Sequence, residues 1–395
     1  MAATTPSGSG GSGGGGPSRR YMLASTVLVD FVDDFEAEPH FVSNLALSKS
    51  GKVLAAASTK RVVHLFDTTN DLASISEMTG HSKMITGLVS SAKQDEIFVT
   101  SSYDGFVCLW DTRTSKSVIQ IQHKAQLSSV TIEGGSSSTY LAAASADTVF
   151  ISDVRMPEFK TLQQLKPHSD EISHIKFHPV QRNMLWSSSF DGLICSHDMN
   201  ELSKRHDSLV AILPIEEPVK SFGFFGKDAG FLSCETSNHN ASLWRISDEE
   251  CLVNWKSLRE DLASRCPIPI DQLIQFCSVE NQLMLLCGSQ DGEITVWRVS
   301  VKPDTKPTLE PFTALRNVHT SLIREAVWPT STKIFTGGED ARICEWRFTS
   351  AAPPAVERKM IPSAPVYSSS LSTAGYPSDA SPLPPIQRKA KEPSS

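Results

Sequence analysis

The stretch that decides the fold is SYDGFVCLWD, Ser102–Asp111. Its first residues are typical of a tight turn, and the rest alternates apolar side chains before it ends on Trp-Asp, as a half-buried strand does. Related segments recur as FDGLICSHD at 190–198, QDGEITVWR at 290–298 and EDARICEWR at 339–347. Weaker copies are TKRVVHLFD at 59–67, ADTVFISD at 146–153 and NHNASLWRI at 238–246.

An apolar, strand-like run lies upstream of the better copies, as in IFVTSS before the first and IFTGGE before the last. Repeats at intervals of about 40–50 residues, each with several short strands, indicate a β-propeller. We therefore predict an all-β fold with seven blades, whose approximate cores are 40–79, 80–122, 123–166, 167–214, 215–255, 270–314 and 315–348. Six or eight blades remain as alternatives, because the segment 247–270 is irregular and contains a short helical pattern at Ser257–Cys266.

The last blade has no fourth strand, whereas Met22–Phe31 is strand-like and belongs to no blade. Pairing the two would close the ring and remove exposed strand edges. The predicted organisation is therefore a disordered Gly/Ser tail at 1–20, a propeller at 21–349 and a disordered Pro/Ser-rich tail at 350–395. Neither tail has enough large apolar residues to offset the entropy of ordering it. Deleting 1–20 or 355–395 should leave melting unchanged.

A polar set accompanies the repeat. An Asp precedes the Trp by six residues, a Ser or Thr often lies four residues before the Asp, and a His often lies in the loop upstream. The Asp can cap the turn and accept from the His, and the hydroxyl can reach the Trp N–H, which would make one network per blade. The members are His81, Thr100, Asp104 and Trp110; His319, Thr336, Asp340 and Trp346; His168, Ser187 and Asp191, with His197 at the Trp position; and Asp291 with Trp297.

A His, a hydroxyl and an Asp also resemble a catalytic triad. We favour the structural interpretation, because a set repeated in several blades cannot be several active sites and because the Trp usually accompanies it. A similar choice arises for His168, His174 and His178. They could bind a metal ion together, or each could pack separately in a loop or strand; separate packing is the better interpretation. The sequence thus predicts no catalytic residue, no metal site and no cofactor.

Composition narrows the class of protein. The chain has 395 residues and a net charge of −7, without the basic stripe that nucleic-acid binding needs and without an apolar run long enough for a membrane helix. Its eight cysteines form no CxxC pair, and several lie in apolar strand-like runs, which favours reduced core thiols and a cytoplasmic and/or nuclear location. We expect neither a direct nucleic-acid partner nor a membrane.

GHSKMITGLV at 80–89, followed by VTSSYDGFVCLWD at 99–111, resembles the WD-repeat family. The stretches at 167–200, 271–299 and 317–348 resemble the WD repeat-containing protein 89 family in particular. The resemblance implies a non-catalytic scaffold whose propeller faces bind other proteins or peptides. Departures from the family pattern are the missing Trp in blades one, three and four, and Asn238 where blade five would carry Asp.

The strand ends suggest a more specific function. Asp111 and Arg113 form a DxR box, and Asp153 and Arg155 form another in the next blade. In substrate receptors of cullin-RING ubiquitin ligases, two consecutive DxR boxes place arginines on the lower face of the propeller, where they contact a propeller-type adaptor. Arginine suits such a contact because its planar fork makes several hydrogen bonds. The alternative is an ordinary blade end, in which each Arg pairs with its neighbouring Asp.

A second class of function is an assembly factor. WD-repeat proteins of this kind also serve in ribosome biogenesis. The short basic group Arg388, Lys389 and Lys391 would fit a nuclear or nucleolar location. The two hypotheses differ in one respect: a ligase receptor should lose its adaptor when Arg113 and Arg155 become Ala, whereas an assembly factor should keep its particle.

Overall fold

The computed structural model describes residues 20–29, 40–132, 140–155, 161–200, 208–302 and 305–349. Of Arg20 and Thr349 it describes the backbone alone. Except for Arg20, the predicted tails lie outside the described residues, as do Arg388, Lys389 and Lys391.

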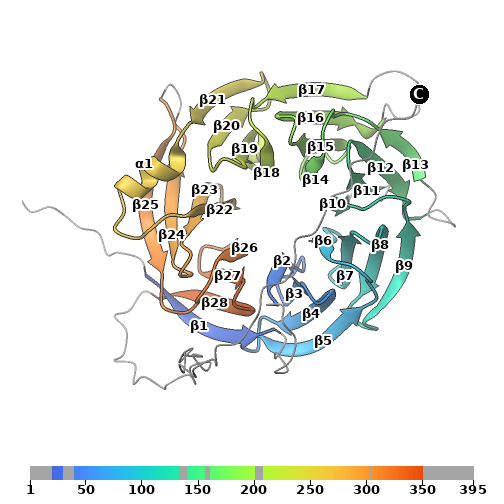
Figure 1. Ribbon diagram of the computed structural model, residues 1–395, viewed down its shortest axis with the longest axis horizontal. Coiled ribbons are helices and arrows are strands. Elements are labelled where there is room, and N and C mark those ends of the chain that lie inside the picture. Colours follow the sequence, from blue (N-terminus) through green and yellow to red (C-terminus); the bar gives the residue numbers. More distant parts are fainter. Residues whose placement is uncertain are drawn as a thin grey trace, which may run out of the picture. The chain divides into compact units, whose positions relative to one another are not determined.

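The described residues form seven four-stranded antiparallel sheets, which Figure 1 shows side by side in a ring. The predicted seven-bladed propeller is thus confirmed. The first three blades, from the inner to the outer strand, are β2 (Val42–Leu47), β3 (Val53–Ser58), β4 (Val62–Asp67) and β5 (Ala73–Thr79); β6 (Ile85–Ser90), β7 (Ile97–Ser102), β8 (Phe106–Asp111) and β9 (Lys116–Gln122); β10 (Ser129–Ile132), β11 (Tyr140–Ser145), β12 (Thr148–Asp153) and β13 (Thr161–Leu165).

Blades four to six continue the pattern. Their strands are β14 (Ile172–Phe177), β15 (Met184–Ser189), β16 (Leu193–Asp198) and β17 (Leu209–Pro214); β18 (Val219–Phe225), β19 (Phe231–Thr236), β20 (Ala241–Arg245) and β21 (Glu250–Trp255); β22 (Gln272–Val279), β23 (Gln282–Gly288), β24 (Ile294–Ser300) and β25 (Thr308–Leu315). A short 3₁₀ turn at Lys227–Ala229 joins β18 to β19.

The helix α1 (Leu258–Ser264) occupies the irregular segment between blades five and six, within the predicted helical pattern. Its buried residues Leu258 and Leu262 join the apolar cluster between these two blades, so the segment packs as a connector and adds no blade. None of the helices in the described residues is long and apolar enough to cross a membrane.

The seventh blade is assembled from both ends of the propeller. It contains β26 (Ile323–Thr330), β27 (Lys333–Gly338), β28 (Arg342–Thr349) and, as its outer strand, β1 (Arg20–Leu28). β1 pairs antiparallel with β28 from Arg20 opposite Thr349 to Leu28 opposite Arg342. The predicted closure by an N-terminal strand is therefore confirmed; the strand begins two residues earlier than Met22 and ends at Leu28.

The core lies between the blades. Each of seven apolar clusters among the described residues joins a pair of neighbouring sheets, and one of them joins blade seven to blade one. Trp110 of blade two, for example, is buried with Ala46 and Met78 of blade one. Because the clusters follow one another around the ring, breaking the ring at one point exposes the apolar faces of two blades.

Charged groups reinforce the closure. Glu345 of β28 is fully buried and pairs with Lys333 (Nζ–Oε1 2.9 Å) and Arg347 (Nε–Oε1 2.7 Å). Its other oxygen, Oε2, accepts from Ser25 of β1 at 3.2 Å. Lys333 also donates to the carbonyl of Thr68 in blade one, at 3.0 Å. The buried carboxylate is thus satisfied by groups from two strands of its own blade and by the closing strand.

Candidate functional site

Two faces of the propeller carry the residues singled out by sequence. Two kinds of turn form the face that we call the lower face: those that join the first strand of each blade to the second, and those that join the third strand to the fourth. The upper face is formed by the turns between the second and third strands and by the connections between blades. The predicted polar networks lie toward the upper face, and the DxR boxes lie on the lower face.

In blade two the four predicted network residues are in contact. Nδ1 of His81 lies 3.0 Å from Oδ2 of Asp104, and its Nε2 lies 2.7 Å from Oγ1 of Thr100. The indole N–H of Trp110 donates to the same Oγ1 at 2.8 Å. A neutral His81 that donates from Nδ1 completes one directional chain, from Trp110 through Thr100 and His81 to Asp104.

Blades seven and four repeat this arrangement. In blade seven, His319 contacts Asp340 at 3.0 Å and Thr336 at 2.8 Å, and Trp346 donates to Thr336 at 2.9 Å. In blade four, His168 contacts Asp191 at 3.1 Å and Ser187 at 2.9 Å.

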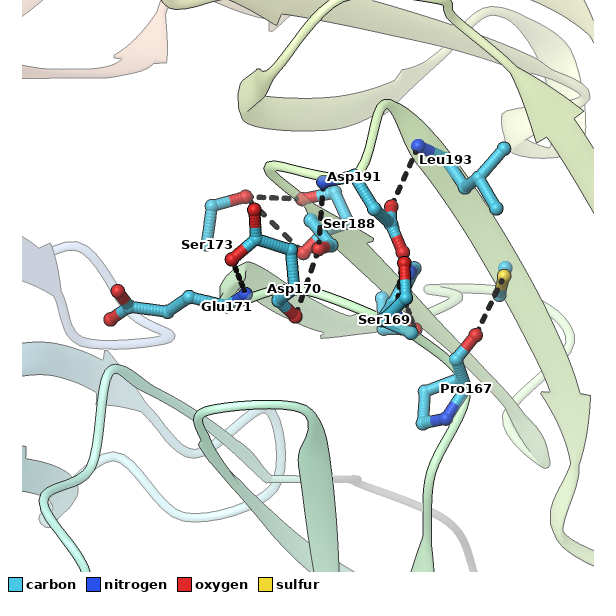
Figure 2. A network of polar contacts seen from close by, with 12 residues as sticks. Pro167, Ser169, Asp170, Glu171, Ser173, Ser188, Asp191 and Leu193 are labelled. Atoms are coloured by element: carbon cyan, nitrogen blue, oxygen red, sulfur yellow. Dashed lines mark hydrogen bonds and ion pairs between the residues drawn. The ribbon is translucent and has the colours of Figure 1, made fainter.

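Figure 2 shows how Asp191 is held. It accepts from the backbone N–H groups of Ser169 and Leu193, each at 3.0 Å. At the Trp position of this blade stands His197, which contacts Ser208 at 3.2 Å. The aspartate therefore caps the turn even where the Trp is missing.

The network aspartates of blades two and seven are held as carboxylates. Burial alone would raise the pKa of Asp340, but hydrogen bonding and charge interaction with His319, with donors in the turn, lower it below its ordinary value. Asp104 follows the same balance: burial raises its pKa, but the N–H groups of Phe106 and Ser82 together with His81 outweigh this and lower the pKa below its ordinary value. Each set is thus a satisfied structural element.

In blades five and six the indole N–H of the Trp has a different hydrogen-bond acceptor. In both, a Cys replaces the Thr, and the Trp donates to a hydroxyl two residues before it: Trp244 to Ser242 at 2.9 Å and Trp297 to Thr295 at 3.1 Å. The hydroxyl and the thiol have exchanged strands. The cross-strand pairs are Thr100 with Cys108, Ser187 with Cys195, Cys234 with Ser242, Cys287 with Thr295 and Thr336 with Cys344.

These cross-strand pairs account for most of the buried thiols. The five cysteines of these pairs are all buried, and burial raises the pKa of Cys108 and Cys344 to about 12. They are inert core groups beside the hydroxyl that each Trp or His needs. Two of the eight cysteines depart from a core position, since Cys251 is exposed and Cys266 is half-buried.

One predicted position, Asp291, does not join a network. Asp291 is exposed, and its blade has no His in the preceding loop; instead Asp271 accepts from the backbone N–H of Gln290 at 2.7 Å. In blade five, Asn238 stands where the repeat pattern has Asp. Asn238 and Asn240 donate to Glu217, at 3.3 and 3.0 Å, so a glutamate from the preceding loop supplies the carboxylate of this turn.

A metal site was the alternative interpretation for His168, His174 and His178, and each of them has a separate packing role in the structure. His168 belongs to the network of blade four. His174 stacks edge-on against Phe222 with ring centroids 5.5 Å apart, and burial lowers its pKa to about 3. His178 accepts from the N–H of Gln181 at 2.8 Å and donates from Nε2 to the carbonyl of Ala229 at 3.1 Å. The part of the chain that the structure describes holds no group of three His, Cys, Asp or Glu side chains that could bind a metal ion.

On the lower face the two DxR boxes have matching geometry. Arg113 donates from Nε to Oδ1 of Asp111 at 2.9 Å and from Nη2 to Oδ2 at 2.5 Å. Arg155 donates to Asp153 in the same way, at 2.9 and 2.6 Å. The arginine side chains are 70% and 55% exposed, whereas the aspartates beneath them are 11% and 9% exposed. A partner on this face would therefore meet the guanidinium groups first.

The aspartate of each box has a local role that needs no arginine. Oδ1 of Asp111 accepts from the backbone N–H of Arg113 at 2.9 Å, which caps the turn. Asp67 in blade one caps the N–H of Thr69 in the same way, at 2.8 Å, and Asp198 in blade four caps that of Asn200 at 2.8 Å. Because these turns form with Thr or Asn, the turn does not explain the two arginines.

Comparison with known proteins fits this architecture. A family model described as "WD domain, G-beta repeat" matches residues 72–111 and 159–198. The chain thus contains WD repeats within a seven-bladed β-propeller. Each matched stretch begins at the outer strand of one blade and ends with the third strand of the next, at Asp111 and Asp198. This offset between the WD repeat and the blade leaves the last blade one strand short, and β1 supplies that strand.

Curated relatives extend the likeness over most of the propeller. The chain is 26% identical to the WD repeat-containing protein 89 homolog of Dictyostelium discoideum, over 76% of this chain and 82% of that protein. It is 27% identical to the WD repeat-containing protein GTS1 of Arabidopsis thaliana, over 69% of this chain and 72% of that protein. A shorter match, 24% identical over 40% of this chain and 42% of the relative, is to the Ribosome biogenesis protein WDR12 homolog of Arabidopsis thaliana.

Proposed function

We propose that this WD-repeat protein is a non-catalytic interaction scaffold that binds a partner protein through Arg113 and Arg155 on its lower face. The more specific form of the proposal is a substrate receptor of a cullin-RING ubiquitin ligase, with the propeller-type adaptor of the ligase as the partner. The observation that carries it is the identical presentation of two exposed arginines on adjacent blades.

Comparison with the other strand ends supports this interpretation. Arg245 of blade five pairs with Asp248 at 2.8 Å and Glu250 at 2.7 Å, so it is tied into its own turn. Arg347 of blade seven pairs with Glu345 in the closure network. Arg113 and Arg155 also pair with an aspartate of their own turn, as at an ordinary blade end, but their side chains are 70% and 55% exposed against 40% for Arg245. Their exposed edges can donate to carbonyl and carboxylate oxygens of a partner.

The experiment is affinity capture of the tagged full-length chain from cells, with mass spectrometry of what is bound. The wild type is compared with Arg113→Ala/Arg155→Ala and with Arg245→Ala as the matched control for loss of a lower-face arginine. Capture of the adaptor by the wild type and the control, with loss in the double variant, supports the receptor. Equal capture by all three chains refutes the role of the two arginines.

The second candidate function is an assembly factor in ribosome biogenesis, in the nucleus. Its support is the shorter match to a relative named as a ribosome biogenesis protein. This candidate predicts that pre-ribosomal proteins are captured by the wild type and by the double variant alike, with no ligase adaptor present. In both cases the partner is a protein, since the acidic balance of the chain does not favour direct binding to nucleic acid.

A further inference from the structure

Each outer strand among the described residues carries a β-bulge opposite the Trp position. In blade two, for example, Ser117 pairs with Trp110 and Ile119 with Leu109, so Val118 is the extra residue. The equivalent bulge residues in blades one to seven are Ile75, Val118, Leu162, Val210, Leu252, Phe312 and Ala24. A bulge adds twist to an edge strand, and this does not require a large side chain, as Ala24 demonstrates.

The bulge residues differ in what covers them. Leu252 and Phe312 are partly buried against the apolar clusters of blades five to seven. By contrast, Ile75, Val118 and Leu162 are 48%, 60% and 47% exposed, although Ile and Val side chains gain by leaving water. Packing within the chain therefore explains the apolar bulge residues of blades five and six. It leaves those of blades one to four unexplained, since Val210 of blade four is also 58% exposed.

Ile75, Val118 and Leu162 each lie near the start of an outer strand, close to the lower-face turn that precedes it. The turn that carries Arg113 is joined to the outer strand of blade one by the hydroxyls of Ser115 and Ser76, 2.8 Å apart, and Ser76 follows Ile75. In blade three, Val154 precedes Arg155 and packs into the same apolar cluster as Ile119, the neighbour of Val118. We call the resulting series the rim row: Ile75, Arg113, Val118, Arg155 and Leu162.

We propose that the rim row is the docking surface for an acidic partner segment whose apolar side chains alternate with carboxylates. The carboxylates would accept from the exposed guanidinium edges, and the apolar side chains would cover Ile75, Val118 and Leu162. Charge complementarity favours an acidic segment, because the aspartates that balance the two arginines are buried beneath them. This inference rests on the proposed function, since it uses the same arginines and adds apolar anchors and a partner chemistry.

Blade four offers a matched control. Val210 occupies the same bulge position and is 58% exposed, but its blade ends in Asp198-Met199-Asn200 and has no arginine there. The test uses two fluorescein-labelled peptides, one alternating Glu and Leu and one alternating Lys and Leu, titrated with the full-length chain by fluorescence anisotropy. The variants are Val118→Asp, Leu162→Asp, Arg113→Ala/Arg155→Ala and Val210→Asp.

The wild type should bind the Glu-Leu peptide and not the Lys-Leu peptide. Val118→Asp and Leu162→Asp should each weaken binding by about tenfold, the loss expected for one apolar anchor, and Val210→Asp should bind like the wild type. Val118→Ser, which keeps a small uncharged side chain in the bulge, replaces Val118→Asp if that variant melts at a lower temperature. Equal binding of the two peptides, or an equal loss in Val210→Asp, overturns the inference.

The same variants separate this inference from the proposed function when purified adaptor is the second probe. If the adaptor does not bind the wild type but the acidic peptide binds through the rim row, the receptor assignment is wrong and the docking surface stands. If the adaptor binds and is lost only in the arginine variant, while Val118→Asp and Leu162→Asp bind adaptor and peptide like the wild type, the receptor assignment stands and the rim row is wrong.

Discussion

The polar network of blade two can be tested by removing one hydroxyl. Thr100 is fully buried, and its Oγ1 satisfies both Nε2 of His81 and the indole N–H of Trp110. Thr100→Val keeps the shape of the side chain but leaves two buried polar groups without a partner. Each such group costs about 1–3 kcal/mol, so the variant should lose about 3 kcal/mol of unfolding free energy. Urea unfolding followed by tryptophan fluorescence measures the loss.

Blade six supplies the comparison. Thr295 accepts from the indole N–H of Trp297 but, unlike Thr100, has no network histidine to satisfy, so Thr295→Val should cost about half as much as Thr100→Val. The exchange variant Thr100→Cys/Cys108→Thr copies the arrangement of blades five and six in blade two. It should return a partner to Trp110 but not to His81, and its loss should fall between that of Thr100→Val and zero.

The comparison between the two single variants decides the outcome. If Thr100→Val loses no more stability than Thr295→Val, the hydroxyl does not couple His81 to Trp110 and the network argument is wrong. Thr100→Ser is the control: it keeps the hydroxyl and removes only a methyl group, which costs about 1 kcal/mol.

Three further predictions concern closure and pH. Tyr21 of β1 is buried and packs edge-on against Trp328, with ring centroids 5.7 Å apart. Tyr21→Ala should therefore lower the unfolding free energy by about 3 kcal/mol and Tyr21→Phe by about 1 kcal/mol. Equal losses of the two variants in urea unfolding would contradict the packing. Deleting residues 1–28 should abolish cooperative melting in calorimetry, and an unchanged transition would count against closure by β1. The lowered pKa of His174 means that the unfolded chain binds more protons than the folded chain below about pH 6.5, so stability falls as pH falls. About 1 kcal/mol of the loss between pH 7.5 and 5.5 should vanish in His174→Phe, and an identical pH dependence of the two chains would refute this.

Most of the fold could be predicted from the sequence because the repeat encodes it locally. The spacing of Asp104 and Trp110 fixes one turn and one strand, and its recurrence gives the number of blades. Closure was also predictable, since an unpaired strand at Met22–Phe31 and an incomplete last blade require one another. The alternatives of six or eight blades fall away because the irregular segment holds α1 and no additional sheet.

The site was less predictable, for a physical reason. A hydrogen-bond partner can come from the opposite strand, so the exchange of Cys287 with Thr295 is invisible to a search for a hydroxyl four residues before the Asp. Asp291 also matches the sequence pattern, although it is exposed and joins no network. The Trp of its blade, Trp297, donates instead to Thr295 on its own strand. Bulges such as that at Val118 arise from strand pairing and leave no local signal, which is why the rim row emerges only from the structure.

The measurement that tests the central claim most directly is an arginine footprint of the complex purified with the tagged chain. Reaction with an arginine-specific dicarbonyl is compared for the free and the bound chain by mass spectrometry. The account predicts that Arg113 and Arg155, the two exposed arginines of the DxR boxes, become protected on binding, while Arg245 on blade five keeps its reactivity. A stable complex in which Arg113 and Arg155 react as fast as in the free chain would contradict docking on the lower face at blades two and three.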